Sequence, residues 1–121
     1  MHIQFAELPV FDQDRAKKFY ADHFGCEVAA DVPMGGDGWR WIELKFPGAD
    51  TALHFLRRND DAPSDGPVLV LMDDDVDTIV KTLKSKGVAI IAEPQAAPYD
   101  PRRTVAEFRD SEGNRMVISS R

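Results

Sequence analysis

The sequence predicts an α+β protein made of two βαβββ modules, because the same order of elements occurs twice. In the first half, an apolar stretch over residues 5–10 precedes acidic residues, an amphipathic helix and Gly25. About sixty residues later, an apolar stretch over 68–72 again precedes acidic residues, a helix and Gly87. Further strand-like runs close each half. A duplicated module of this kind predicts two curved sheets that form one eight-stranded cleft.

The first module is expected to span residues 1–58. Its helix begins after Asp12 and Asp14, whose carboxylates can cap a helix N-terminus, and ends at Gly25. The apolar residues of this helix recur at helical spacing: Ala16, Phe19, Tyr20 and Phe24. Strands are predicted over residues 3–10, 26–30, 39–46 and 51–56, with a Pro-Gly turn joining the last two into a hairpin.

The second module is expected to span residues 66–121, after a charged linker over 59–65. Asp74 and Asp75 are the predicted capping residues of its helix. The apolar face of that helix has the spacing i, i+3, i+4, i+7: Val76, Ile79, Val80 and Leu83. Strands are predicted over 68–72, 88–92, 104–109 and 115–119. Residues 93–103 contain three prolines and are predicted to form a loop.

Composition excludes several classes of function. A chain of 121 residues favours one domain. The net charge of −6 argues against nucleic-acid partners and anionic membranes, which require a basic surface. Cys26 is the only cysteine, so no intrachain disulfide can form, as is typical of the reducing cytoplasm. No apolar run approaches the roughly 18 residues of a membrane span. We therefore expect a cytoplasmic protein.

Five stretches carry a family resemblance: residues 10–20 (VFDQDRAKKFY), 24–28 (FGCEV), 39–44 (WRWIEL), 83–88 (LKSKGV) and 108–114 (FRDSEGN). Together they resemble the vicinal oxygen chelate superfamily, which includes glyoxalase I, bleomycin-resistance proteins, extradiol dioxygenases and fosfomycin-resistance enzymes. The resemblance covers essentially the whole chain. It implies paired βαβββ modules around a cleft and a homodimer.

The resemblance also implies where a metal would bind. Metal-dependent members hold a divalent ion with four side chains, two from each module, and those positions fall here on Phe5, His54, Val68 and Val117. Only His54 has a side chain that can bind a metal, whereas catalytic sites need three or more such ligands. We therefore expect no cofactor, with a divalent metal as the alternative and His54 as its only candidate ligand among the four.

Three functions remain open. The first is a protein that binds a small apolar or aromatic molecule in the cleft without the family's four metal ligands. The second is a metal-dependent lyase, isomerase or dioxygenase with an altered site, formed by His54 with Glu7, Glu43 or Glu107. The third is a module that only dimerises. No catalytic residue is assigned, but His54 and Glu7 are the candidates, because histidine gains and loses a proton near neutral pH.

Strand alternation indicates which residues line the cleft. If Leu53 and Phe55 face the helix, His54 faces the opposite way. Two tryptophans beside a glycine-rich turn suggest a stacking wall for a planar ligand, although core packing would also explain either of them. The expected ligand-binding residues are Phe5, Glu7, Trp39, Trp41, Glu43, His54, Val68 and Val117.

Overall fold

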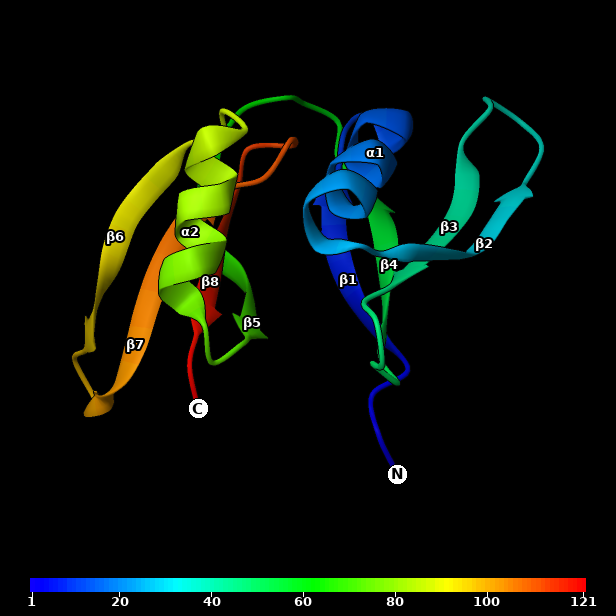
Figure 1. Cartoon of the computed structure of the whole chain (residues 1–121). Coiled ribbons are helices and arrows are strands. Elements are labelled where there is room, and N and C mark those ends of the chain that lie inside the picture. Colours follow the sequence, from blue (N-terminus) through cyan, green and yellow to red (C-terminus); the bar gives the residue numbers. More distant parts are fainter. The chain divides into compact units, whose positions relative to one another are not determined.

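The computed structural model describes residues 1–121, which form two compact units. The boundary between them in the chain falls between Asp61 and Ala62. Each unit contains one helix and four strands (Figure 1). The first unit comprises β1 (Phe5–Val10), α1 (Gln13–Phe24), β2 (Glu27–Pro33), β3 (Arg40–Lys45) and β4 (Ala52–Arg57). The second comprises β5 (Ser64–Met72), α2 (Val76–Ser85), β6 (Ile90–Ala97), β7 (Asp100–Arg109) and β8 (Asn114–Ser119).

Both sheets are mixed and have the same topology. The strand order is β1-β4-β3-β2 in the first unit and β5-β8-β7-β6 in the second. The first strand of each unit is parallel to the last, and the other neighbours are antiparallel. The prediction of two βαβββ modules is therefore confirmed.

The prediction of a loop over residues 93–103 is wrong. β6 continues to Ala97 and β7 begins at Asp100, with Gln95 opposite Val105 in the ladder. The three prolines of this segment favoured a loop, but Pro94 lies in β6, which is an edge strand. A proline is tolerated at an edge because its missing N–H is not needed by a second neighbour.

The strand predicted over 68–72 is also longer than expected. β5 begins at Ser64, which lies inside the expected linker over 59–65. Ser64 is paired with Asn114 of β8, and its N–H donates to the carbonyl oxygen of Gly113 at 2.9 Å. Pairing with a strand fifty residues away is a tertiary effect that local composition does not encode.

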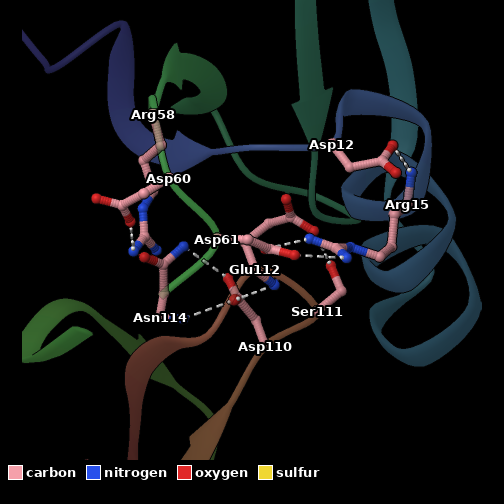
Figure 2. A network of polar contacts seen from close by, with 9 residues as sticks. All are labelled: Asp12, Arg15, Arg58, Asp60, Asp61, Asp110, Ser111, Glu112 and Asn114. Carbon is pink, nitrogen blue, oxygen red and sulfur yellow. Dashed lines mark hydrogen bonds and ion pairs between the residues drawn. The ribbon is translucent and has the colours of Figure 1, made fainter. Parts of the chain in front are cut away.

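Aspartates cap both helices as the sequence predicted. The Asp12 carboxylate accepts a hydrogen bond from the Arg15 backbone N–H at 3.1 Å, and Figure 2 shows this contact. The Arg15 guanidinium in turn pairs with Asp61 at 2.7 Å, which holds the pKa of the Asp61 carboxyl below its usual value. In the second unit, Asp75 accepts from the Thr78 N–H at 3.3 Å.

Each sheet buries one face, and α1 packs against β3 while α2 packs against β6 and β7. The first core contains Leu8, Val10, Ala16, Tyr20, Ile42, Leu44, Leu53 and Phe55. The second contains Val76, Val80, Leu83, Ala106, Phe108, Met116 and Ile118. Because side chains alternate along a strand, the residues between these project from the opposite, open face of each sheet.

The turn between β7 and β8 is held by the Asp110 carboxylate. Its Oδ1 accepts from the backbone N–H groups of Glu112 and Asn114, both at 2.9 Å, and its Oδ2 accepts from the Asn114 side-chain amide at 3.1 Å (Figure 2). Gly113 has φ +75°, a conformation that favours glycine. The Asp-x-x-Gly-Asn run of the sequence is thus a hairpin turn.

Neither helix has the length and apolar composition that crossing a membrane requires.

Candidate ligand-binding site

Three ionisable side chains form one row across the open face of the first sheet. Glu7 of β1 lies opposite His54 of β4, and His54 lies opposite Glu43 of β3. Residues that pair across neighbouring strands share a face, so two carboxylates flank one imidazole. Leu53 and Phe55 are both buried, so the condition set for His54 to project from the open face is met.

The imidazole of His54 is oriented by Glu7. Its Nδ1 lies 2.6 Å from Oε2 of Glu7, and the His54 side chain is 12% exposed. An ionised carboxylate can only accept hydrogen bonds, so Nδ1 is the nitrogen that carries the proton in this contact. The other ring nitrogen, Nε2, makes no hydrogen bond. In the neutral ring, Nε2 is therefore a hydrogen-bond acceptor.

Two aromatic rings surround His54. The indole of Trp41 stacks on the imidazole, with the ring centroids 3.9 Å apart and the planes at 29°. Phe5 meets Trp41 edge to face at 5.8 Å and lies 5.9 Å from His54. The Trp41 Nε1–H donates to Oε2 of Glu43 at 2.7 Å, which sets the orientation of the indole. We call Phe5, Trp41 and His54 the aromatic patch.

A hollow of about 630 Å³ adjoins the aromatic patch within the first unit. It shares Phe5 with the patch and Glu43 with the row beside it, and its other lining residues include Gln4, Ala29, Lys45 and Ala52. A volume of several hundred Å³ is the usual size of a small-molecule pocket.

A second group of polar residues lies on the α1 side of the same sheet. Its central contact, between Gln13 and Arg40, was not predicted from the sequence. Gln13 is buried, with 7% of its surface exposed, and its side chain bonds to the backbone of Arg40. The Arg40 guanidinium bridges Asp14 of α1 at 2.7 Å and Asp31 of β2 at 2.9 Å. Arg40 therefore faces the helix, whereas its neighbour Trp41 faces the opposite side.

The charged side chains of this group change one another's pKa values. Hydrogen bonds from Arg40 and then from Lys17 lower the pKa of Asp31 to about 2. Arg40 also lowers the pKa of Asp14, and the two carboxylates raise the pKa of Arg40. Asp14, Asp31 and Arg40 are thus charged at neutral pH, and their ion pairs hold α1, β2 and β3 together.

Trp39 is separated from the aromatic patch. Its ring lies under the Arg57 guanidinium, 5.3 Å from the ring centroid, and its backbone N–H donates to Asp37 at 3.2 Å. Asp37 also pairs with Arg57, which lowers the pKa of that carboxyl. These residues border another hollow of about 300 Å³. The sequence suggested that Trp39 and Trp41 form one stacking wall. In the structure Trp39 lies against Arg57, whereas Trp41 stacks on His54.

Val68 and Val117 belong to the second unit. Val117 of β8 is half-buried and lies opposite Val70, which is 61% exposed. Val68 is half-buried on β5. This open face is therefore partly apolar, as the sequence indicated.

The residues present do not fit the metal site of the metal-dependent relatives. Of the four expected positions only His54 offers a ligand atom, and within neither unit do three or more His, Cys, Asp or Glu side chains converge on a metal-binding arrangement. Glu43 accepts from Trp41, and Glu107 pairs with Arg115 at 2.5 Å. Within the first unit, Glu7 is the carboxylate that contacts His54.

Comparison with known proteins establishes the class to which this fold belongs. The family model described as the Glyoxalase/Bleomycin resistance protein/Dioxygenase superfamily matches residues 2–118. The chain belongs to this superfamily, and the resemblance inferred from the sequence is confirmed. Among its relatives is the protein YetH of Bacillus subtilis (strain 168), which is 30% identical over 111 residues, covering 90% of this chain and 89% of that protein.

Solved structures give the same result. A member of the superfamily from Sphaerobacter thermophilus DSM 20745 has a TM-score of 0.85 with 25% identity, covering 100% of this chain and 98% of that one. TnmS3, an antibiotic-binding protein from Streptomyces sp. CB03234, has a TM-score of 0.80 with 33% identity, covering 99% of this chain and 95% of that one.

Proposed function

We propose that the chain binds a small planar molecule, apolar or aromatic, on the open face of the first sheet. The observation that carries this proposal is the stack of Trp41 on His54, with Phe5 at its edge and a hollow of about 630 Å³ beside it. Aromatic side chains on a sheet face offer a large contact area that loses little conformational entropy on binding.

The similarity to an antibiotic-binding protein supports this proposal. TnmS3 is 33% identical to this chain over nearly its whole length. Two proteins of this similarity share a fold, but the fold itself hosts many functions. The argument therefore depends on the aromatic patch, and the relative indicates that the fold can carry a small-molecule site of this kind. The proposal needs no metal, since the site binds by shape and stacking.

Calorimetric titration with 2-methoxynaphthalene tests the proposal. This probe is planar, uncharged and lacks a hydrogen-bond donor, so it reports stacking alone. We expect saturable binding, and we expect Trp41→Ala to weaken it about 10- to 100-fold, because truncating a buried aromatic anchor typically costs about 1.4–2.8 kcal/mol of binding free energy. A non-planar probe of similar size, decahydronaphthalene, should bind more weakly.

Trp39→Ala is the matched control, because Trp39 pairs with Arg57 and lies outside the patch. This variant should keep the affinity of the wild-type protein within about twofold, in line with a tryptophan that makes no contact with the ligand. Equal losses in Trp39→Ala and Trp41→Ala would contradict the proposed site. No saturable binding of any planar aromatic would contradict the proposed function.

We also propose that the chain forms a homodimer, as its family resemblance implies. Light scattering coupled to size-exclusion chromatography measures the mass directly, and a mass equal to one chain of 13.5 kDa would contradict it.

A further inference from the structure

The two ring nitrogens of His54 have different surroundings. Nδ1 is engaged by the Glu7 carboxylate at 2.6 Å, whereas Nε2 has no hydrogen-bond partner. The His54 side chain is 12% exposed, and Nε2 is left as an acceptor that no protein donor occupies. A ligand that donates a hydrogen bond to Nε2 would therefore gain affinity.

The geometry of the stack determines where such a donor must lie. The lone pair of Nε2 lies in the plane of the imidazole, and that plane is tilted by only 29° from the indole of Trp41. A hydrogen-bond donor attached directly to an aromatic ring also lies in or near the plane of its ring. A planar ligand that lies edge to edge with His54, in or near the plane of the imidazole, can therefore direct a ring substituent along the lone pair of Nε2.

The charges around His54 determine which donor is suitable. Glu7 and Glu43 flank the imidazole in the cross-strand row, and both approach it from neighbouring strands. Two carboxylates disfavour an anionic ligand group at this place. A neutral hydroxyl avoids that repulsion and still donates to nitrogen.

We propose that the site selects planar aromatic ligands that carry a hydroxyl group on the ring, with the O–H donating to Nε2 of His54. This inference rests on the proposed function and adds the chemical class of the ligand. Glu7 is a positioning residue in this arrangement. By accepting from Nδ1–H, it fixes the ring orientation and keeps the lone pair on Nε2.

The test compares 2-naphthol with 2-methoxynaphthalene by calorimetry at pH 7.5. The two probes have the same ring system, but only the naphthol can donate a hydrogen bond. We expect the wild-type protein to prefer 2-naphthol about three- to tenfold, the usual contribution of one hydrogen bond. Replacement of His54 by phenylalanine keeps an aromatic ring under Trp41 and removes both nitrogens. In His54→Phe the ratio of the two affinities should fall to about one, whatever the change in the affinity for 2-methoxynaphthalene itself.

Glu7 variants test the positioning role. In Glu7→Gln the amide oxygen can still accept from Nδ1–H, so the preference for 2-naphthol should be largely retained. In Glu7→Ala the ratio of the two affinities should fall toward one, because the Nδ1–H loses its acceptor. A merely structural role for Glu7 would instead weaken both probes together.

The outcomes separate the two proposals. Equal affinity of the wild-type protein for both probes, or a preference that persists in His54→Phe, overturns the selection of hydroxylated ligands and leaves the proposed function intact. Failure of both probes to bind the wild-type protein contradicts the proposed function, and the inference falls with it.

Discussion

The side chain of Gln13 is bonded twice to the backbone of Arg40. Its Nε2 donates to the Arg40 carbonyl oxygen at 2.6 Å, and its Oε1 accepts from the Arg40 N–H at 3.0 Å. The first residue of α1 is thereby joined to the first residue of β3. Because Trp41 follows Arg40 directly, this contact on the helix side sets the position of the indole on the open face.

Replacing Gln13 with alanine should destabilise the first unit by about 1–3 kcal/mol, because it removes two hydrogen bonds from a buried side chain and leaves a backbone N–H and C=O unpaired. Urea denaturation monitored by circular dichroism measures this loss. Gln13→Glu retains an oxygen for the Arg40 N–H but has no donor for the carbonyl when ionised. The free energy of unfolding of Gln13→Glu should therefore lie between those of Gln13→Ala and the wild type. Identical stability of all three proteins would refute the contact.

Replacing Asp31 with asparagine should cost about 1 kcal/mol of stability at pH 7, because it removes pairs with Arg40 and Lys17. The folded-state pKa of Asp31, about 2, lies below its ordinary value of 3.8. Its ionisation therefore stabilises the fold above about pH 4, and that stabilisation is lost as the pH falls through 2.

The difference in stability between wild type and Asp31→Asn should accordingly shrink between pH 4 and pH 2, as measured by urea denaturation at several pH values. Asp22→Asn is the control, because Asp22 pairs with Lys18 at a site where both side chains are at least half exposed. It should change stability by less than about 0.5 kcal/mol. A constant difference for Asp31→Asn across this pH range would argue against the ion pairs.

Cys26 should be inert in the folded protein. Burial raises the pKa of its thiol to about 12, so the reactive thiolate is almost absent at pH 8. We expect no reaction with 5,5′-dithiobis(2-nitrobenzoate) within minutes in native buffer and one thiol per chain in 6 M guanidinium chloride. Rapid native labelling would show that the thiol is accessible.

Gly113→Ala should destabilise the second unit for two reasons. Its φ is +75°, and an added Cβ would lie 2.9 Å from the Cα atom of Pro63, which is a backbone atom and cannot move aside easily. Gly87→Ala is the matched control, since Gly87 has φ +82° but no atom within 4 Å of the added Cβ. We expect a loss of about 1 kcal/mol for Gly87→Ala and clearly more for Gly113→Ala in thermal unfolding. Equal losses would show that the clash with Pro63 is relieved.

Much of the fold follows from local patterns in the sequence. Asp12 and Asp75 cap the helices, and alternation along β4 placed Leu53 and Phe55 together on one face, which the structure buries. These features depend on residues a few positions apart, whose relation is set by helical or strand geometry. The strand residues within 93–103 were missed because their strand character comes from the pairing of β6 with β7, whereas the three prolines favoured a loop.

The candidate site was predicted only in part. The sequence grouped Trp39 with Phe5, Trp41 and His54. In the structure the last three contact one another, and the Trp39 ring lies against Arg57. The sequence did not predict the role of Gln13, because a glutamine between two aspartates is easily assigned to the acidic segment that caps the helix. Its partner lies 27 residues away in the chain, and no local pattern records that contact.

The sequence by itself determined the duplicated order of elements, the capping of both helices by aspartates and the presence of a single potential metal ligand, His54, among the four positions that the resemblance implies. Only the tertiary structure decided that Glu7, rather than its row neighbour Glu43, orients His54, and that Trp41 covers the imidazole. The physical reason is strand register. A shift of one residue between β1 and β4 would move Glu7 to the other face, and register depends on contacts between segments nearly fifty residues apart.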